Sequence, residues 1–292
     1  MTSEAIRQLA VIGAGAMGSG IAHLAAQSGL TVVLYDRERA ALEAAQRRIR
    51  GLIDRAVEKG RVTAEEAERQ WERLRFSEAM DPVAEADFCV EAVFESYAVK
   101  EAVFRTLDGM CRPEVILATN TSSIPITSIA AATARRDKVV GMHFFNPPQV
   151  MRLVEVVRGL DTSDETVAVT RGLAERMGKT TVEVKRDTPG FIVNRIMVPQ
   201  FIEAIRLVEE GVASIEDVDT AVKLGLNYPM GPFELQDFGG LEIALHVMDV
   251  FYEETKDDRY AAPQSLRTLV RAGRLGRKTG RGWYDYEGGE KR

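Results

Sequence analysis

A glycine-rich segment near the N-terminus constrains the fold of this chain more than any other feature. An apolar, β-branched run at residues 9–12 is typical of a strand buried on both faces of a parallel sheet. It leads into the pattern G-x-G-x-x-G, and we expect a helix behind it at residues 17–28. These glycines allow a tight turn, close approach to a pyrophosphate, and packing of the helix on the strand. The segment therefore predicts a dinucleotide site with the phosphates at the helix N-terminus. The residues expected to bind the cofactor there are Gly13, Gly15, Ala16, Met17 and Gly18.

Asp36 follows the next expected strand, residues 31–35, and lies 18 residues after Gly18. This is close to the roughly 20 residues expected for the carboxylate that accepts the ribose 2′-hydroxyl. Because a carboxylate repels a 2′-phosphate, Asp36 favours NAD over NADP. Arg37 and Arg39 leave NADP open, since a guanidinium beside the acid would tolerate the extra phosphate. The alternative interpretation of Asp36 is an ordinary strand-ending turn residue.

The composition bounds the class of protein. With 45% hydrophobic and 28% charged residues, the chain of 292 residues is typical of a globular protein. A net charge of −6 argues against nucleic acid as the main partner. No apolar run approaches the ~18 residues of a membrane helix, and no signal or transit peptide is expected. Cys89 and Cys111 lie in or beside apolar runs and are expected to be buried and free, which suits a reducing compartment. We therefore expect a cytoplasmic protein with no membrane partner and no metal site.

Strands recur along the first part of the chain with helical spacers between them, which indicates an open α/β sheet. After the first two strands, they are expected at residues 88–93, 115–119, 138–145, 153–157 and 181–185. Residues 38–75 are charged and helical in period, with a break at 58–60 and a capping box formed by Thr63 and Glu66. They predict a helical hairpin inserted into the sheet. Its basic residues, which either meet substrate phosphates or form a solvated face, are Arg47, Arg48, Arg50, Arg55, Lys59 and Arg61.

The pattern becomes helical after a turn at residues 187–190. Long apolar helices are expected at residues 191–210 and 233–252, and Ser214 is expected to cap another helix between them. The predicted fold class is thus α/β. A Rossmann-type, doubly wound, mostly parallel sheet with a helical-hairpin insertion spans residues 1–186, and a smaller all-α domain spans residues 187–292. The wide apolar faces of the helical domain suggest that it meets a second subunit.

His143 and Glu155 are the strongest candidates for chemistry. His143 interrupts an apolar strand at the sheet edge where ligands are expected, and an imidazole can take a proton from an alcohol. Glu155 is a single carboxylate in a run that should be buried, where an unpartnered charge is very costly. The turn at residues 146–148 can fold the strand of Glu155 back beside His143, so that the acid orients the base. Together with a dinucleotide, this pair indicates hydride transfer to or from an alcohol, and a purely structural pair is the alternative.

The other candidates have two interpretations each. Residues 120–123, Asn-Thr-Ser-Ser, follow a strand, so one hydroxyl caps the next helix or holds a substrate oxygen. Asn194 lies near the start of an apolar helix and faces either a cleft or a backbone carbonyl. For His23 and His246, a packed or surface role is expected.

The chain closely resembles the short-chain L-3-hydroxyacyl-CoA dehydrogenases, especially the bacterial 3-hydroxybutyryl-CoA dehydrogenases, over essentially its whole length. The segments that carry the resemblance are VIGAGAMGSGIA, TNTSSIPITSIA, GMHFFNPP, RLVEVVRG, DTPGFIVNR, KLGLNYPMGPFEL and GRKTGRGWYDY. The resemblance implies that the hydroxyl of a 3-hydroxyacyl-CoA is oxidised to a ketone with NAD, and that the chain forms a homodimer through its helical domain. A dehydrogenase of a free 3-hydroxy acid or sugar acid on the same fold, and a catalytically silent NAD-binding protein, are the alternatives.

The resemblance also implies roles for single residues. His143 would be the base, Glu155 its orienting partner, and Ser122 and Asn194 would bind substrate oxygens. Contacts with the cofactor are implied for Glu95, Lys100, Asn120, Asn146 and Lys278, and contacts with the CoA phosphates for Lys59. Three departures from the family pattern are Thr119 in place of a serine, Pro148-Gln149 in place of Val-Pro, and Leu52 in place of a hydroxyl or amide residue.

Overall fold

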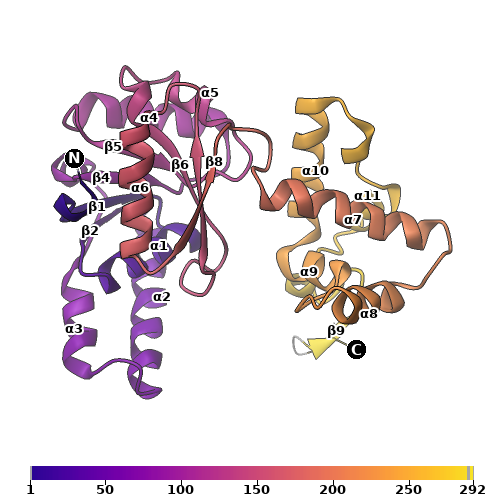
Figure 1. Cartoon of the computed structure of the whole chain (residues 1–292). Coiled ribbons are helices and arrows are strands. Elements are labelled where there is room, and N and C mark those ends of the chain that lie inside the picture. The colour runs from indigo at the N-terminus through magenta and orange to yellow at the C-terminus, as the bar shows by residue number, and fades with distance from the viewer. Residues whose placement is uncertain (1, 288–289, 292) are drawn as a thin grey trace. The chain divides into compact units, whose positions relative to one another are not determined.

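The chain folds into two compact units in the computed structural model, which describes residues 2–287 and 290–291. The N-terminal unit is Met1–Thr188 and the C-terminal unit is Pro189–Arg292 (Figure 1). In the described part of the chain, no helix is both long enough and apolar enough to cross a bilayer.

An eight-stranded sheet organises the N-terminal unit, with the strand order β3-β2-β1-β4-β5-β6-β7-β8. Neighbouring strands from β3 to β6 pair in parallel, β7 pairs antiparallel with β6, and β8 is again parallel to β7. This confirms the predicted Rossmann-type, mostly parallel sheet. The strands are β1 (Gln8–Ile12), β2 (Thr31–Tyr35), β3 (Leu74–Ser77), β4 (Phe88–Glu91), β5 (Ile116–Thr119), β6 (Val139–Phe144), β7 (Leu153–Arg158) and β8 (Thr180–Val184).

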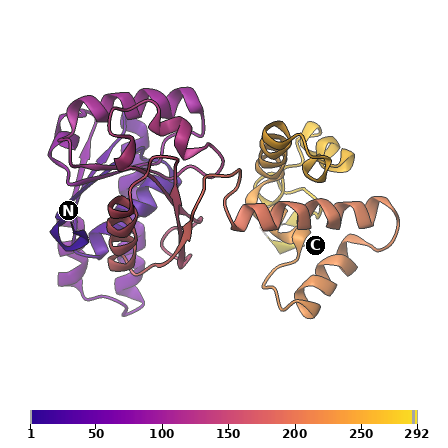
Figure 2. The same cartoon turned by 45° about the horizontal axis from the view of Figure 1, so that its top comes forward.

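Helices lie between the strands of this unit, and Figure 2 shows them on both sides of the sheet. They are α1 (Ala16–Gln27), α2 (Arg39–Glu58), α3 (Ala64–Glu72), α4 (Tyr97–Met110), α5 (Ile126–Ala130) and α6 (Asp164–Arg176). In Figure 1, α2 and α3 form the predicted hairpin, which projects from the lower end of the unit. The Thr63 hydroxyl accepts a hydrogen bond from the amide of Glu66 at 3.2 Å, as expected for the cap of α3.

Strand β3 differs from the prediction, because the charged helical pattern extends as far as residue 75. The structure instead pairs β3 with β2, with Leu74 opposite Val32 and Phe76 opposite Leu34. Leu74 is buried, and in a strand this alternation directs Leu74 and Phe76 to the same face. Packing against the sheet therefore overrides the local helical preference of the segment.

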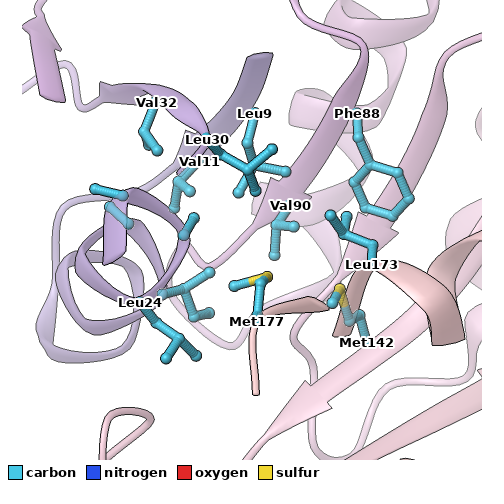
Figure 3. Close-up of a cluster of buried hydrophobic side chains, with 14 of the residues drawn as sticks. Leu9, Val11, Leu24, Leu30, Val32, Phe88, Val90, Met142, Leu173 and Met177 are labelled. Atoms are coloured by element: carbon cyan, nitrogen blue, oxygen red, sulfur yellow. The ribbon is translucent and has the colours of Figure 1, made fainter. Parts of the chain in front are cut away.

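The core of the N-terminal unit shows how the sheet is covered. Leu9 and Val11 of β1 lie on one face with Leu24 of α1 and with Leu173 and Met177, which belong to α6 and the residue after it (Figure 3). All five side chains are at most 7% exposed. Because successive side chains of a strand point to opposite faces, the intervening residue of β1 is directed to the other side of the sheet. The carboxyl ends of the strands are therefore held by a sheet that is packed on both faces.

The C-terminal unit is helical, as predicted, apart from a short two-stranded sheet. Ser214 caps α8 through a hydrogen bond from the amide of Asp217. Gly240, which has a φ of +102°, separates two helices where one was predicted. Glycine adopts this φ without steric cost and weakens a continuous helix, which explains the break. The elements are α7 (Val193–Glu209), α8 (Ile215–Gly225), α9 (Pro232–Gly239), α10 (Leu241–Thr255), α11 (Gln264–Arg271), β9 (Tyr286–Glu287) and β10 (Glu290–Lys291).

A buried aspartate, Asp237, ties the segment around residue 284 to α9. Its carboxylate accepts hydrogen bonds from the amides of Trp283 and Tyr284 at 2.9 and 3.0 Å and from the Tyr286 hydroxyl at 2.8 Å. Burial raises the pKa of this carboxyl, although the three hydrogen bonds favour the ionised form. A Cβ at Gly282 would lie 2.0 Å from an Asp237 oxygen, so the glycine is needed there. The Gly-rich motif at residues 276–286 therefore has a structural role in this unit.

Candidate active site

The site lies at the edge of the sheet where the parallel strands end and the antiparallel strand β7 begins, and there β6 and β7 place His143 and Glu155 opposite each other. Nδ1 of His143 lies 2.7 Å from Oε2 of Glu155. His143 is 5% exposed and Glu155 is fully buried. The predicted antiparallel return of the chain is thus present. Since a buried carboxylate requires a partner, the contact with the imidazole explains how Glu155 is accommodated in an apolar strand.

Asn120 links the end of β5 to the end of β6. Thr119, the last residue of β5, pairs with Gly141 of β6, so Asn120 lies at the edge of the sheet to which the end of β6 extends. Oδ1 of Asn120 accepts a hydrogen bond from the amide of Phe144 at 2.9 Å. Asn120 therefore holds the backbone next to His143, which is a role that does not require a ligand.

The serine loop, residues 121–123, follows Asn120 and is gathered around the carboxylate of Glu95. Oε1 of Glu95 accepts hydrogen bonds from the amides of Ser122 and Ser123 at 3.0 and 3.2 Å. It also accepts from the hydroxyls of Ser123, at 3.0 Å, and Thr121. Burial alone would raise the pKa of the Glu95 carboxyl, but the Lys100 ammonium and the bond from Thr121 hold that pKa below its ordinary value. An ionised Glu95 thus sets the conformation of the loop that carries Ser122.

Lys100 is buried inside this network, with 1% of the residue exposed. Its ammonium lies 2.6 Å from Oε1 of Glu91 and 3.2 Å from Oε2 of Glu95. Glu91 is fully buried, and its other oxygen accepts a hydrogen bond from the Thr119 hydroxyl at 2.7 Å. The resemblance implies cofactor contacts for Glu95 and Lys100, and these contacts remain predictions.

Sequence reasoning did not single out Glu91. The available signal was the same one that identified Glu155, namely a single carboxylate at the end of an apolar strand, Phe88-Cys89-Val90-Glu91. Helix α4, which carries Lys100 nine residues further along, supplies the compensating charge.

The glycine turn between β1 and α1 fits a dinucleotide. At Gly13, with φ +105°, a Cβ would lie 2.6 Å from the carbonyl oxygen of Ala92, and at Gly18 it would lie 1.8 Å from the carbonyl oxygen of Gly13. At Gly15, by contrast, a Cβ would meet no heavy atom within 4 Å. Two of the glycines therefore serve internal packing, whereas Gly15 borders open space at the N-terminus of α1, where backbone N–H groups favour an anion.

Asp36 lies beside this turn, as the spacing predicts. Its Oδ2 accepts a hydrogen bond from the amide of Ala14 at 2.8 Å, and its Oδ1 accepts from the amide of Glu38 at 3.0 Å. Arg37 and Arg39 are exposed and pair with Glu38 and Glu43. The turn and the carboxylate together form a surface that suits the pyrophosphate and the adenine ribose of a dinucleotide.

The remaining predicted residues lie outside these contacts. Asn146 and Lys59 are exposed, at the turn after β6 and at the end of α2. Asn194 and Lys278 belong to the C-terminal unit. Asn194 is half-buried in the first turn of α7, and Lys278 pairs with Glu242. Within residues 2–287 and 290–291, no cluster of three or more His, Cys, Asp or Glu side chains is placed to hold a metal ion.

Comparisons with known proteins cover both units. The family model "3-hydroxyacyl-CoA dehydrogenase, NAD binding domain" matches residues 8–188, and "3-hydroxyacyl-CoA dehydrogenase, C-terminal domain" matches residues 190–286. A probable 3-hydroxybutyryl-CoA dehydrogenase of Bacillus subtilis is 49% identical over 282 residues, which is 97% of this chain and 98% of that protein. A crystal structure of (S)-3-hydroxybutyryl-CoA dehydrogenase from Ralstonia eutropha matches with a TM-score of 0.94 at 43% identity, covering 97% of this chain and 100% of that chain.

Proposed function

Because the chain belongs to the 3-hydroxyacyl-CoA dehydrogenase family, an NAD-dependent class of oxidoreductase, we propose that it interconverts a short-chain (S)-3-hydroxyacyl-CoA and the 3-ketoacyl-CoA. The preferred substrate is 3-hydroxybutyryl-CoA, on the strength of the names of its relatives. The single observation that carries the proposed chemistry is the contact between His143 and Glu155 at the edge of the sheet that also holds the glycine turn.

His143 acts as the general base in this proposal. Glu155 accepts a hydrogen bond from the Nδ1–H group of the imidazole, so Nε2 is the nitrogen that takes the proton of the substrate hydroxyl. When NAD is bound, its nicotinamide supplies the acceptor for the hydride of the carbinol carbon. In the opposite direction, the imidazolium of His143 donates its Nε2 proton to the oxygen of the ketone. The buried carboxylate of Glu155 stabilises that cation without leaving the sheet.

The other residues bind and orient. Ser122, on the loop fixed by Glu95, is proposed to donate to the substrate oxygen, and Asn194 to make a second contact with the substrate. Gly13, Gly15, Ala16, Met17, Gly18 and Asp36 are proposed to hold NAD, with further contacts from Glu95, Lys100, Asn120, Asn146 and Lys278. Lys59, an exposed cation on the helical hairpin, is proposed to meet a phosphate of CoA.

The decisive experiment is a steady-state assay of NADH and NADPH oxidation with acetoacetyl-CoA and with longer 3-ketoacyl-CoA substrates. The proposal expects turnover with acetoacetyl-CoA and NADH, and a much lower kcat/KM with NADPH. Free acetoacetate is the matched control, since activity on the free acid without a response to acyl-CoA would favour the alternative substrate class. Binding of NADH without turnover of any acyl-CoA would favour a catalytically silent protein.

We also propose a homodimer formed through the C-terminal unit. The support is a set of exposed apolar side chains on α7, α8 and the following turn, where Ile196, Leu224 and Leu226 are 58%, 82% and 60% exposed. Such surfaces in a small helical domain are typical of subunit contacts. Sedimentation equilibrium tests this proposal: the expected mass is twice that of the chain, and Leu226→Asp is expected to shift the protein to monomer. The cytoplasmic location remains a prediction.

A further inference from the structure

A chain of four side chains runs through the interior from the end of β5 to the serine loop. The Thr119 hydroxyl donates to Glu91, Glu91 contacts the ammonium of Lys100, and the same ammonium contacts Glu95. Glu95 then accepts from the amides of Ser122 and Ser123. Each successive pair lies within 3.2 Å. Glu91 contacts neither amide directly. It reaches the loop through Lys100 and Glu95, and also through the Thr119 hydroxyl, which accepts a hydrogen bond from the amide of Thr121 at 3.2 Å.

We propose that Glu91 and Thr119 are positioning residues of the dehydrogenase site, which set the conformation of the serine loop through Lys100 and Glu95 and through the amide of Thr121. The inference deepens the proposed function and rests on it for the role of Ser122. Glu91 ends β4 and Thr119 ends β5, so both lie at the edge of the sheet where the ligands are expected.

Burial is the first reason to assign this role. Glu91 and Lys100 are 0% and 1% exposed, and desolvation of such charges offsets most of their mutual attraction. An apolar pair of similar volume would serve stability as well or better, so the pair is not explained by stability alone. What the charges do provide is an ammonium fixed at a defined position, and that ammonium keeps Glu95 ionised beside the amides of the loop.

Thr119 supplies the second reason. Serine is expected at this position in the family pattern, and threonine and serine both carry the hydroxyl that donates to Glu91. The departure from the pattern is therefore conservative for the contact that matters in this proposal. Valine has the shape of threonine but neither donates to Glu91 nor accepts from the amide of Thr121, so Thr119→Val removes both contacts of the hydroxyl at once.

The experiment compares Thr119→Val with Thr119→Ser. In Thr119→Val, one oxygen of the buried Glu91 carboxylate loses its donor, so the Glu91 side chain and Lys100 are expected to shift. The amide of Thr121 also loses its acceptor. We expect kcat/KM for acetoacetyl-CoA to fall by about tenfold or more, the size typical for loss of a hydrogen bond to a charged group. The Kd of NADH is expected to rise as well, because Lys100 and Glu95 are proposed to contact NAD. Thr119→Ser should retain the wild-type values.

Amide hydrogen exchange gives a measurement that does not depend on activity. Exchange at Ser122 and Ser123 should be about tenfold faster in Thr119→Val than in Thr119→Ser, since their acceptor is less firmly held. Asp108→Asn is the matched control: it weakens the ion pair with Arg135, 2.7 Å long, at the far end of the same helix α4. It should lower the unfolding midpoint while leaving kcat and the exchange of the serine loop unchanged.

Two results would overturn the inference. The first is equal exchange of the loop amides in Thr119→Val and Thr119→Ser. The second is an equal effect of Thr119→Val and Asp108→Asn on both stability and kcat, which would reduce Glu91 and Thr119 to a structural role. A wild-type protein that fails to reduce any 3-ketoacyl-CoA would instead contradict the proposed function. The exchange measurement would still decide whether the contacts of Thr119 and Glu91 position the loop.

Discussion

Nδ1 of His143 and Oε2 of Glu155 are 2.7 Å apart, on two antiparallel strands whose register sets the two residues directly opposite each other. The backbone pairing of the two strands therefore sets the distance between the two side chains. A carboxylate at this position favours the imidazole tautomer with the proton on Nδ1 and stabilises the imidazolium that forms when Nε2 gains a proton. The predictions on this pair follow from that geometry.

The first prediction concerns His143→Ala. Loss of the general base should lower kcat by about 10² or more. The Kd of NADH should change by less than about twofold, because the glycine turn lies on other strands. Steady-state kinetics and a fluorescence titration with NADH measure the two quantities. A variant with the wild-type kcat would show that His143 is not the base.

The second prediction concerns Glu155→Gln, which keeps the shape of the side chain and removes its charge. If Glu155 acts only through His143, Glu155→Gln should lower kcat in the wild-type background and have almost no further effect in the His143→Ala background. Residues that act as a unit show such non-additive effects. The four kcat values of the double-mutant cycle provide the test. Additive losses would mean that Glu155 affects turnover independently of the imidazole.

The sequence was sufficient to predict this pair because both residues are exceptions to an apolar strand pattern. The same pattern predicted the main strands of the sheet to within about two residues at each end. Strand β3 could not be predicted, since Leu74-Arg75-Phe76-Ser77 is short and continues a helical period. Its strand conformation depends on pairing with β2, which lies about forty residues earlier in the chain. Tertiary contacts of this kind are not visible in local patterns.

The charge network shows a similar limit. The motifs place Glu95, Lys100 and the serine loop near the site, but they do not show that Lys100 is buried between two carboxylates. That arrangement depends on how α4 brings Lys100 to Glu91 at the end of β4 and to Glu95. The break between α9 and α10 was likewise missed, because Gly239 and Gly240 occur within an otherwise apolar helical pattern.

The third prediction concerns Asp36. In Asp36→Ala, the loss of a charged acceptor should weaken NADH binding by about tenfold. The preference for NADH over NADPH should become smaller, because the carboxylate no longer repels a 2′-phosphate. The variant also removes the acceptor for the amide of Ala14, so a lower unfolding midpoint is expected. Dissociation constants of both cofactors should be measured, with Glu38→Gln as a neighbouring exposed control. If the ratio of the dissociation constants of NADPH and NADH is unchanged in Asp36→Ala, Asp36 is a turn residue only.

The fourth prediction concerns His23 and the pH dependence of stability. Burial lowers the pKa of His23 from 6.5 to about 4, and neither ring nitrogen has a hydrogen-bond partner among the described residues. The fold thus favours the neutral imidazole. The contribution of the neutral His23 to the free energy of unfolding is complete above pH ~6.5. It is lost as the pH falls from there towards ~4, by about 3 kcal/mol in total.

Urea unfolding at pH 7 and at pH 4.5 tests this prediction in His23→Leu. The variant should lose less stability between the two pH values than the wild type does. His246→Leu is the control, because His246 is exposed and its replacement should leave the pH dependence unchanged. Equal pH dependence in His23→Leu and the wild type would mean that His23 is protonated in the fold at low pH without cost.

The fifth prediction separates two glycines of one turn. A Cβ at Gly18 would lie 1.8 Å from the carbonyl oxygen of Gly13, so Gly18→Ala should destabilise the fold by about 1–3 kcal/mol or more. At Gly15 a Cβ meets no heavy atom within 4 Å, and the residue has an ordinary φ of −65°. The free energy of unfolding of Gly15→Ala should therefore lie within about 0.5 kcal/mol of the wild-type value. Gly15→Ala should nevertheless bind NADH at least about tenfold more weakly, because the methyl group occupies the space through which the pyrophosphate approaches the backbone.

Calorimetric titration and thermal unfolding of the two variants give a crossed result, with Gly15→Ala impaired in binding alone. Wild-type NADH affinity in Gly15→Ala would place the pyrophosphate away from this turn and would remove the basis for assigning the cofactor to it.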